Sequence, residues 1–225
     1  HLTVMNEAEV EAVCEVGRSR GKMVAAHARS AESVKMCLRQ GADVIYHATL
    51  SDEEALDMLE ARKEEIFVGP AMGIMYATGE GEGAAWGITR DNPVAVYFRR
   101  ELEMCIENMK ALKKRGVRVL PGGDYGFAWN PIGSNARDLE HFVKLLDYTP
   151  LEAISSATKL GGEIMGMDIG LIREGYLADL LLVDGDPATD VTLLRDAGKL
   201  TCIMKDGAFH KRALDPAKAG QAAAE

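Results

Sequence analysis

Two histidines and one aspartate are the residues of this chain whose types and positions could hold a metal ion. Each follows an apolar, strand-like run: His27 ends 22–27, His47 ends 42–47, and Asp124 comes shortly after 117–121. In barrels and open α/β sheets, catalytic groups gather at the carboxyl ends of parallel strands. Neutral imidazoles and a carboxylate suit zinc or a similar divalent cation. We therefore predict that the three side chains converge on one metal site.

The elements that must position these residues alternate between strand and helix. A further strand-like run covers 66–69, and segments with apolar residues at helical spacing separate the runs. Such alternation predicts fold class α/β, with a parallel sheet and right-handed crossovers. Four strands are too few to close an eight-stranded barrel. An open sheet of four strands would expose two apolar edges, which favours association.

Local signals predict where the helices begin. Ser51 with Glu54 has the pattern of a capping box, and so has Thr149 with Glu152. Pro93 at the first turn predicts a long helix over 93–115. A later helix contains His141, which we expect to be exposed.

The segment 70–92 is rich in glycine and has no sustained period, so we predict a loop without regular structure. Because it leaves the end of a strand, we expect it to lie over the site. Met72, Ile74, Tyr76 and Trp86 could then form an apolar wall for an acyl or side-chain group of a substrate. The other candidates for substrate binding are Tyr46, Tyr125, Trp129 and Arg137, of which Arg137 could clamp a carboxylate with two hydrogen bonds.

The hydrophobic period changes near the carboxyl end. Short apolar runs follow residue 169, and Asp206-Gly207 between two of them predicts a β-hairpin. We expect an α/β part over 1–167, a small β module over 168–214 and a mobile tail over 215–225.

Composition narrows the possible functions. The chain has 225 residues, of which 47% are hydrophobic, and a net charge of −9. The length permits a real core, and the negative charge argues against nucleic-acid and anionic-membrane partners. No apolar run approaches the roughly 20 residues of a membrane span. Four cysteines without paired spacing indicate buried thiols in a reducing compartment, so we expect a cytoplasmic protein.

At the level of motifs, the sequence resembles the amidohydrolase superfamily, in particular its imidazolonepropionase-like and prolidase-like metal-dependent hydrolases. The motifs occur in the order of that family across residues 20–212. They are Ala25-Ala-His-Ala28, Ile45-Tyr-His47, Pro121-Gly-Gly-Asp124, Asn135-Ala-Arg-Asp-Leu-Glu140, Thr149-Pro-Leu-Glu-Ala-Ile154, Glu174-Gly-Tyr-Leu-Ala-Asp-Leu180 and Val183-Asp-Gly-Asp-Pro187.

The resemblance implies the C-terminal half of a (β/α)8 barrel with a small β-sandwich portion. It implies that His27 and His47 are metal ligands on the fifth and sixth strands, and that Asp124 is the carboxylate on the eighth. The implied reaction is hydrolysis of a C–N bond in an amide, dipeptide or cyclic amide. In it, one or two divalent ions, expected to be zinc, activate a water, and Asp124 is general base and then general acid.

Three features depart from the family pattern. The family's first-strand His-x-His pair and its fourth-strand lysine have no counterpart and would precede His1, so we expect a partial polypeptide. Tyr46 replaces a frequent glutamate, and Ile132 stands where relatives often carry histidine. We expect a partner that completes the barrel, either an N-terminal half of the same protein or another copy. The alternative is a catalytically incomplete fragment or scaffold subunit that keeps the fold.

Overall fold

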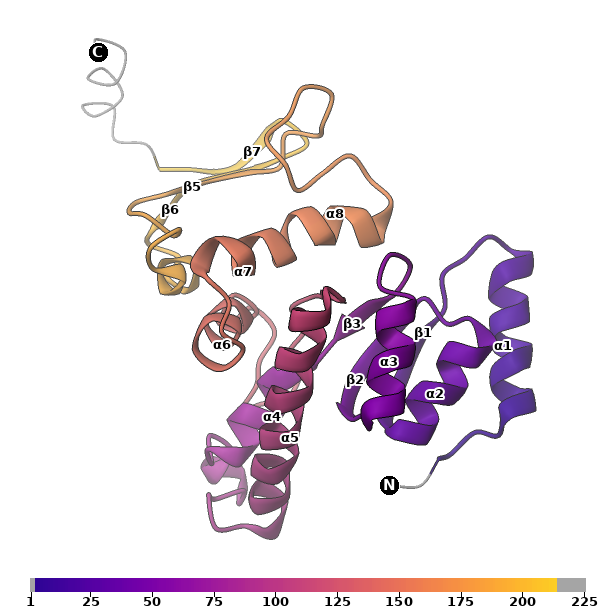
Figure 1. Cartoon of the computed structure of the whole chain (residues 1–225). Coiled ribbons are helices and arrows are strands. Elements are labelled where there is room, and N and C mark those ends of the chain that lie inside the picture. Colours follow the sequence, from indigo (N-terminus) through magenta and orange to yellow (C-terminus); the bar gives the residue numbers. More distant parts are fainter. Residues whose placement is uncertain (1–2, 214–225) are drawn as a thin grey trace. The chain divides into compact units, whose positions relative to one another are not determined.

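The computed structural model describes residues 3–213, which fall into two compact units (Figure 1). One unit contains the described residues up to Asp147, and the other those from Tyr148 onward. The sequence analysis expected the boundary between the two parts after residue 167.

The first unit is built on a parallel sheet with the order β1-β2-β3-β4. This confirms the four predicted parallel strands, although the last two are short. Ile45, Val68 and Val119 lie side by side in register on the three later strands and are fully buried. The strands are β1 (Ala25–Ser30), β2 (Val44–Leu50), β3 (Phe67–Gly69) and β4 (Arg118–Val119).

Helices cover the sheet of the first unit. α2 packs against β1 and β2, α5 packs against β2, and α1 and α3 flank α2. α5 is 23 residues long and runs from Pro93 to Arg115, with Asn92 as its N-cap and Gly116 as its C-cap, which confirms the helix predicted over 93–115. The helices of this unit are α1 (Glu7–Ser19), α2 (Ala31–Gln40), α3 (Glu53–Ala61), α4 (Met72–Gly79), α5 (Pro93–Arg115) and α6 (Arg137–Leu145).

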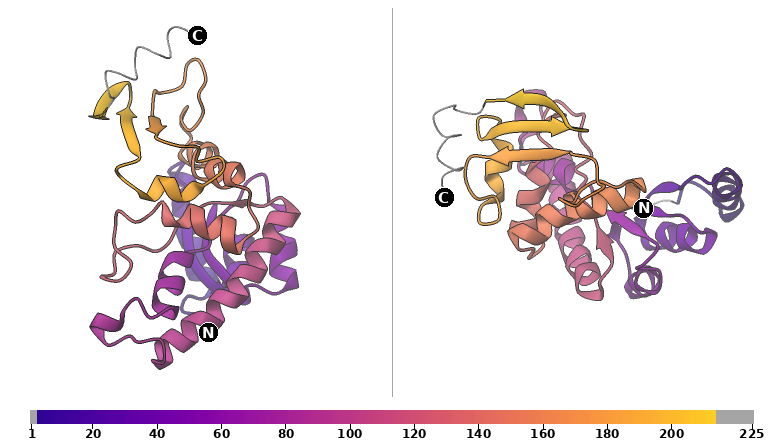
Figure 2. Two further views of the ribbon diagram at one scale, coloured as in Figure 1. Left: turned by 90° about the vertical axis from the view of Figure 1, so that its left-hand side faces the viewer. Right: turned by 90° about the horizontal axis from the view of Figure 1, so that it is seen from above.

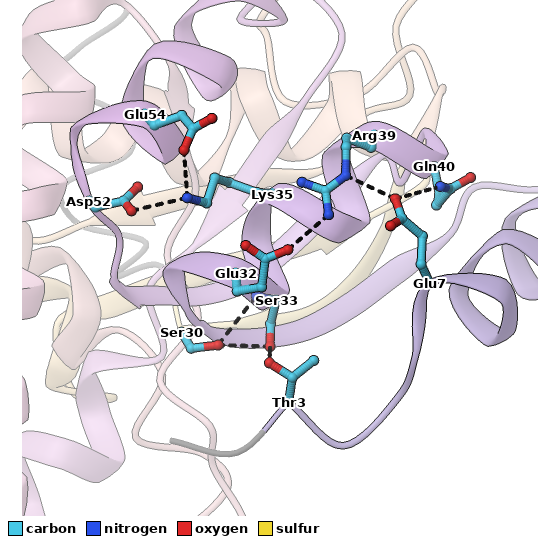
Figure 3. A network of polar contacts seen from close by, with 10 residues as sticks. All are labelled: Thr3, Glu7, Ser30, Glu32, Ser33, Lys35, Arg39, Gln40, Asp52 and Glu54. Atoms are coloured by element: carbon cyan, nitrogen blue, oxygen red, sulfur yellow. Dashed lines mark hydrogen bonds and ion pairs between the residues drawn. The ribbon is translucent and has the colours of Figure 1, made fainter.

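Polar contacts join α2 to its neighbours (Figure 3). The Nζ atom of Lys35 donates to Asp52 Oδ2 at 3.1 Å and to Glu54 Oε2 at 2.6 Å, which fixes the start of α3. Arg39 pairs with Glu7 on α1 at 2.9 Å. The Arg39 pair is exposed, whereas Lys35 is largely buried and only its carboxylate partners face solvent. Pairs with such exposed partners are individually weak, so their main effect is to set how the helices are spaced.

The start of α3 differs from the predicted capping box. Asp52, and not Ser51, is the N-cap, because its Oδ1 accepts a hydrogen bond from the Ala55 amide at 2.9 Å. Ser51 does not cap the helix, because its hydroxyl instead donates to the Ala48 carbonyl in β2 at 2.8 Å.

The prediction of an irregular segment over 70–92 is wrong. Met72–Gly79 forms α4, and Ala84–Trp86 forms a short 3-10 helix, η1. Every residue of α4 except Tyr76 is buried. A helix that is buried all round has no amphipathic period, so the pattern could not reveal it.

The second unit combines two helices with a small antiparallel sheet of order β5-β6-β7 (Figure 2). The predicted hairpin is confirmed, since β6 and β7 are joined by Asp206 and Gly207, with φ of 49° and 76°. The predicted capping box at Thr149 is also present. The elements are α7 (Pro150–Ala157), α8 (Lys159–Met165), β5 (Leu180–Val183), η2 (Val191–Arg195), β6 (Leu200–Lys205) and β7 (Ala208–Arg212).

Two further expectations from the sequence concern the tail and membrane-spanning helices. The predicted mobile tail over 215–225 lies outside the described residues. Within residues 3–213, no helix combines the length and the apolar character that crossing a membrane requires.

Candidate active site

His27 and His47 meet within β1 and β2, as the third residue of one strand and the fourth of the other. The Nδ1 atom of His27 lies 2.9 Å from the Nε2 atom of His47, and the ring centroids are 5.0 Å apart. At this distance one ring donates a proton to the other ring's lone pair. The structure therefore brings together two of the three predicted ligands.

The backbone of β2 makes this meeting possible. His27 is the register partner of Tyr46, so strict alternation would send the next residue, His47, to the opposite face of the sheet. However, His47 and Ala48 have φ values of 76° and 52°. Two consecutive left-handed residues are uncommon outside glycine, and strain of this kind clusters at functional sites. The turn lets the His47 ring reach His27.

The electrostatic surroundings keep His47 neutral. Burial lowers the pKa of His47 to about 3, with smaller contributions in the same direction from the positive charge of Arg29 and from His27. His47 is 1% exposed, and its Nδ1 atom has no hydrogen-bond partner among the described residues. A neutral imidazole at neutral pH is the form that binds a metal.

The pair fits two positions of a zinc shell. Zinc–nitrogen bonds of about 2.0–2.1 Å in a tetrahedral shell place two ligand nitrogens about 3.3 Å apart. The two nitrogens at 2.9 Å would need to separate by only a few tenths of an ångström. His27 and His47 would hold the ion through these two atoms.

Asp124 sits in a tightly held loop after β4. Its φ is 54°, and its carbonyl accepts from the Asn130 side chain at 3.1 Å. The carbonyl of Gly123 accepts from the same amide group at 2.9 Å and from the Ile74 amide at 2.8 Å. Asn130 thus pins the backbone on both sides of the Gly123–Asp124 peptide.

Asp124 does not complete a three-residue cluster with the histidines. In the part of the chain that the structure describes, no group of three or more His, Cys, Asp and Glu side chains is arranged to hold a metal ion. The assignment of Asp124 as ligand and general base stays a prediction.

Next to Asp124, Tyr125 donates its hydroxyl proton to Asp138 Oδ1 at 2.8 Å. His141, one turn further along α6, is 4% exposed and stacks on the Tyr76 ring with centroids 4.7 Å apart. The expectation of an exposed His141 is therefore wrong. The reason is tertiary, because α4 packs on α6 and covers this ring.

Arg137 is already engaged within the chain. It pairs with both carboxylate oxygens of Glu82, at 2.7 and 2.5 Å, and lies over the Tyr76 ring at 4.9 Å from its centroid. The sequence suggested that Arg137 binds a substrate carboxylate with two hydrogen bonds, but in the structure these two bonds go to Glu82.

The aromatic candidates fall into separate places. Trp86, Phe127 and Trp129 form a cluster, with Trp129 6.0 Å from Trp86 and 5.5 Å from Phe127 between ring centroids. The Nε1 atom of Trp129 donates to Thr78 at 2.9 Å. Tyr46 is exposed beside His27, at 5.6 Å between centroids. Of the proposed wall, Met72 and Ile74 are buried inside α4 and contribute no open surface.

Sequence reasoning missed Glu101, Arg29 and Thr49, which form a largely buried polar group on and beside the histidine strands, with Arg29 half-buried. One signal was present. Glu101 precedes Cys105 by four residues, so it lies on the buried stripe of α5, where an unpaired charge would be costly.

Comparison with known protein families identifies the family of this chain. The model of the Amidohydrolase family matches residues 2–209. The chain belongs to the amidohydrolase family.

Among curated relatives of this amidohydrolase, the ochratoxinase of Aspergillus niger is 24% identical over 210 residues, which are 90% of this chain and 41% of that protein. The chain therefore spans about two fifths of the length of that relative.

Solved structures agree with this family. A Xaa-Pro dipeptidase with bound methionine is 26% identical with a TM-score of 0.76, over 92% of this chain and 49% of that one. A prolidase in complex with N-methylphosphonate-L-proline is 25% identical with a TM-score of 0.78, over 92% and 50%. These matches confirm the predicted fold class, the C-terminal part of a barrel of this kind.

Proposed function

We propose that this amidohydrolase is part of a metal-dependent hydrolase that cleaves a C–N bond in an amide, dipeptide or cyclic amide. The observation that carries the proposal is the convergence of His27 Nδ1 and His47 Nε2, 2.9 Å apart, from two neighbouring parallel strands. The similarity to a Xaa-Pro dipeptidase and a prolidase supports a substrate of the dipeptide class.

Each residue has a role that follows from its chemistry. His27 and His47 would hold a divalent cation, zinc in our proposal, with neutral imidazole nitrogens. When bound, such an ion lowers the pKa of a coordinated water to about 7 and polarises a carbonyl. Asp124 would accept the proton of the attacking water and return it to the leaving nitrogen, as general base and then general acid. The pinned backbone on either side of Asp124 supports this role, because a base must be held in place.

The open edges of the sheet indicate where a partner would bind. β1 and β4 are the two outer strands of the sheet, and beside β1 lies a cavity of about 470 Å3. Its lining is mostly apolar and includes Val10, Val13, Cys14, Met36 and Cys37. We propose that the remaining strands of the barrel cover this edge and add ligands, from an N-terminal part of the same protein or from a second copy. The four cysteines are unpaired and buried, which supports the cytoplasm as compartment.

Zinc binding tests the proposal directly. The chain is dialysed to equilibrium against Zn2+, alongside His27→Asn, His47→Asn and the control His210→Asn, an exposed residue of β7. We expect the first two variants to bind zinc at least 10-fold more weakly and the control to match the wild-type chain. Unchanged binding in both ligand variants would refute the metal site. Release of proline from Xaa-Pro dipeptides by the complete, metal-loaded polypeptide tests the reaction itself.

One observation favours the alternative of an incomplete or scaffold protein. Residues 3–213 offer no group of three ligands, so this part of the chain does not close a metal shell. Activity in the complete polypeptide would exclude the alternative. Hydrolysis absent there, despite bound zinc, would favour it.

A further inference from the structure

Glu101 is a carboxylate that the fold removes from water. It lies on α5 and is 2% exposed. A buried charge persists only where partners compensate its lost hydration. The partners of Glu101 therefore indicate what the residue does.

One oxygen of Glu101 bridges the two histidine strands. Its Oε1 accepts a hydrogen bond from Arg29 Nη1 at 2.5 Å and another from Thr49 Oγ1 at 3.1 Å. Arg29 follows His27 by two residues on β1, and Thr49 follows His47 by two residues on β2. The bridge thus joins equivalent positions just beyond the two imidazoles.

The strand ladder does not provide this connection. β1 and β2 pair regularly from Ala25↔Val44 to Ala28↔His47, and then the register shifts to Ser30↔Leu50. The left-handed turn at His47 and Ala48 falls at the same place. Where the ladder is irregular, backbone hydrogen bonds no longer set the spacing of the strand ends.

We infer that Glu101 is a positioning residue that sets how His27 and His47 face each other, by tying Arg29 and Thr49 to one carboxylate oxygen. Its contribution to metal binding rests on the function proposed above, whereas its effect on the histidine pair does not. Loss of a direct hydrogen-bond partner of a metal-ligating histidine typically changes metal affinity 10–100-fold. Glu101 acts one step further from the rings, through Arg29 and Thr49, so we expect an effect at the low end of this range.

The same helix offers a matched control. Asn108 donates from its side chain to the carbonyl of Thr49 at 2.9 Å and to that of Ser51 at 3.2 Å. It therefore anchors α5 to the end of β2, and neither of these two bonds reaches β1. Asn108→Ala removes a tie of comparable kind but leaves the bridge between the strands in place. Glu103→Gln, at an exposed position of α5, controls for loss of charge on the helix.

The variants at Glu101 and Thr49 differ in how strongly they disturb the fold. Glu101→Ala removes the bridge and also leaves Arg29 without its partner. Thr49→Val is nearly isosteric and removes only the hydroxyl, while Thr49→Ser keeps the hydroxyl and should rescue.

Two measurements decide the inference. In the metal-free chain, nitrogen-detected imidazole spectra report the hydrogen bond between His27 and His47. Titration with Co2+ reports metal affinity through its absorption. We expect Glu101→Ala and Thr49→Val to lose the histidine hydrogen bond and to bind Co2+ about 10-fold more weakly. Thr49→Ser, Asn108→Ala and Glu103→Gln should keep both properties, even where the unfolding temperature of Asn108→Ala falls.

The outcomes separate this inference from the proposed function. If Glu101→Ala and Thr49→Val keep the histidine hydrogen bond and lose only stability, Glu101 is merely structural and the inference is wrong. If His27→Asn and His47→Asn leave Co2+ binding unchanged, the metal site is wrong, but the imidazole spectra of the Glu101 and Thr49 variants still decide the positioning role.

Discussion

Gly73 of α4 lies directly against Gly123 of the loop that carries Asp124. A Cβ atom at position 73 would come within 2.7 Å of the Gly123 carbonyl oxygen and 2.9 Å of its Cα. The next residue of α4, Ile74, donates its amide proton to the same carbonyl at 2.8 Å. The helix after β3 and the loop after β4 are therefore packed backbone to backbone.

Gly73→Ala should destabilise the first unit, although alanine is the better helix former. The new methyl group meets backbone atoms that cannot rotate away, and overpacking of this kind costs about 1–3 kcal/mol. Trp86 and Trp129 both belong to this unit, so the fluorescence of tryptophan during urea unfolding measures the effect. Gly161→Ala, in α8 with no atom within 4 Å of the new Cβ, is the control and should not lower the midpoint seen by circular dichroism. A Gly73→Ala midpoint equal to wild type would contradict the close packing.

Local chemistry explains which parts of the fold the sequence could predict. The Asp206–Gly207 hairpin and the start of α5 at Pro93 depend on backbone preferences of a few neighbouring residues. α4 escaped prediction because its burial all round leaves no period. His141 was misjudged because the residues that cover it, Tyr76 among them, are distant in the sequence.

The candidate site was predictable in its residue types but not in its geometry. A histidine at each of two strand ends is visible in the sequence. The left-handed φ of His47, which turns its ring toward His27, is not, because this conformation stays uncommon for a given histidine even though histidine adopts it more often than most residues. The bridge through Glu101 also joins residues from three elements, and no local pattern connects them.

The capping box of α7 gives a second prediction. The Thr149 hydroxyl accepts from the Glu152 amide at 3.2 Å, and Glu152 in turn accepts from the Thr149 amide at 2.8 Å. Thr149→Ala should therefore lower the free energy of unfolding by about 1 kcal/mol. Ser155→Ala, at an exposed position inside the same helix, should leave stability unchanged or raise it slightly. Chemical denaturation followed by circular dichroism distinguishes the two, and an equal effect of both changes would refute the cap.

The buried thiol of Cys105 should lower the free energy of unfolding as the pH rises into the alkaline range. Burial, followed by the charge of Glu101, raises the pKa of its thiol well above the ordinary 9.0. Above about pH 9 the thiol ionises in the unfolded chain but stays protonated in the folded chain, so the unfolded state gains stability as the pH rises. Between pH 8 and 10 the wild-type chain should lose more stability in urea than Cys105→Ala, which has no thiol to ionise at this position.

The same burial should protect Cys105 from alkylation. At pH 8.5 iodoacetamide should leave this thiol unmodified in the folded chain and modify it in urea, as mass spectrometry of peptides would show. Rapid modification under native conditions would contradict both the burial and the pKa.

The last prediction separates the role of Asp124 from that of the histidines, in the complete and metal-loaded polypeptide. Asp124→Asn should keep bound metal and lower turnover by about 10²–10⁴-fold, because an amide keeps the shape of the side chain but cannot accept a proton. His27→Asn and His47→Asn should instead lower metal content, since each replaces an imidazole nitrogen that faces the other at 2.9 Å. Added Zn2+ should then restore part of the activity in the histidine variants and none in Asp124→Asn. Metal content is measured by atomic emission and turnover by release of the free amine. Turnover near the wild-type rate in Asp124→Asn with full metal content would mean that Asp124 serves only the turn after β4, where its φ of 54° and its carbonyl bond to Asn130 already place it.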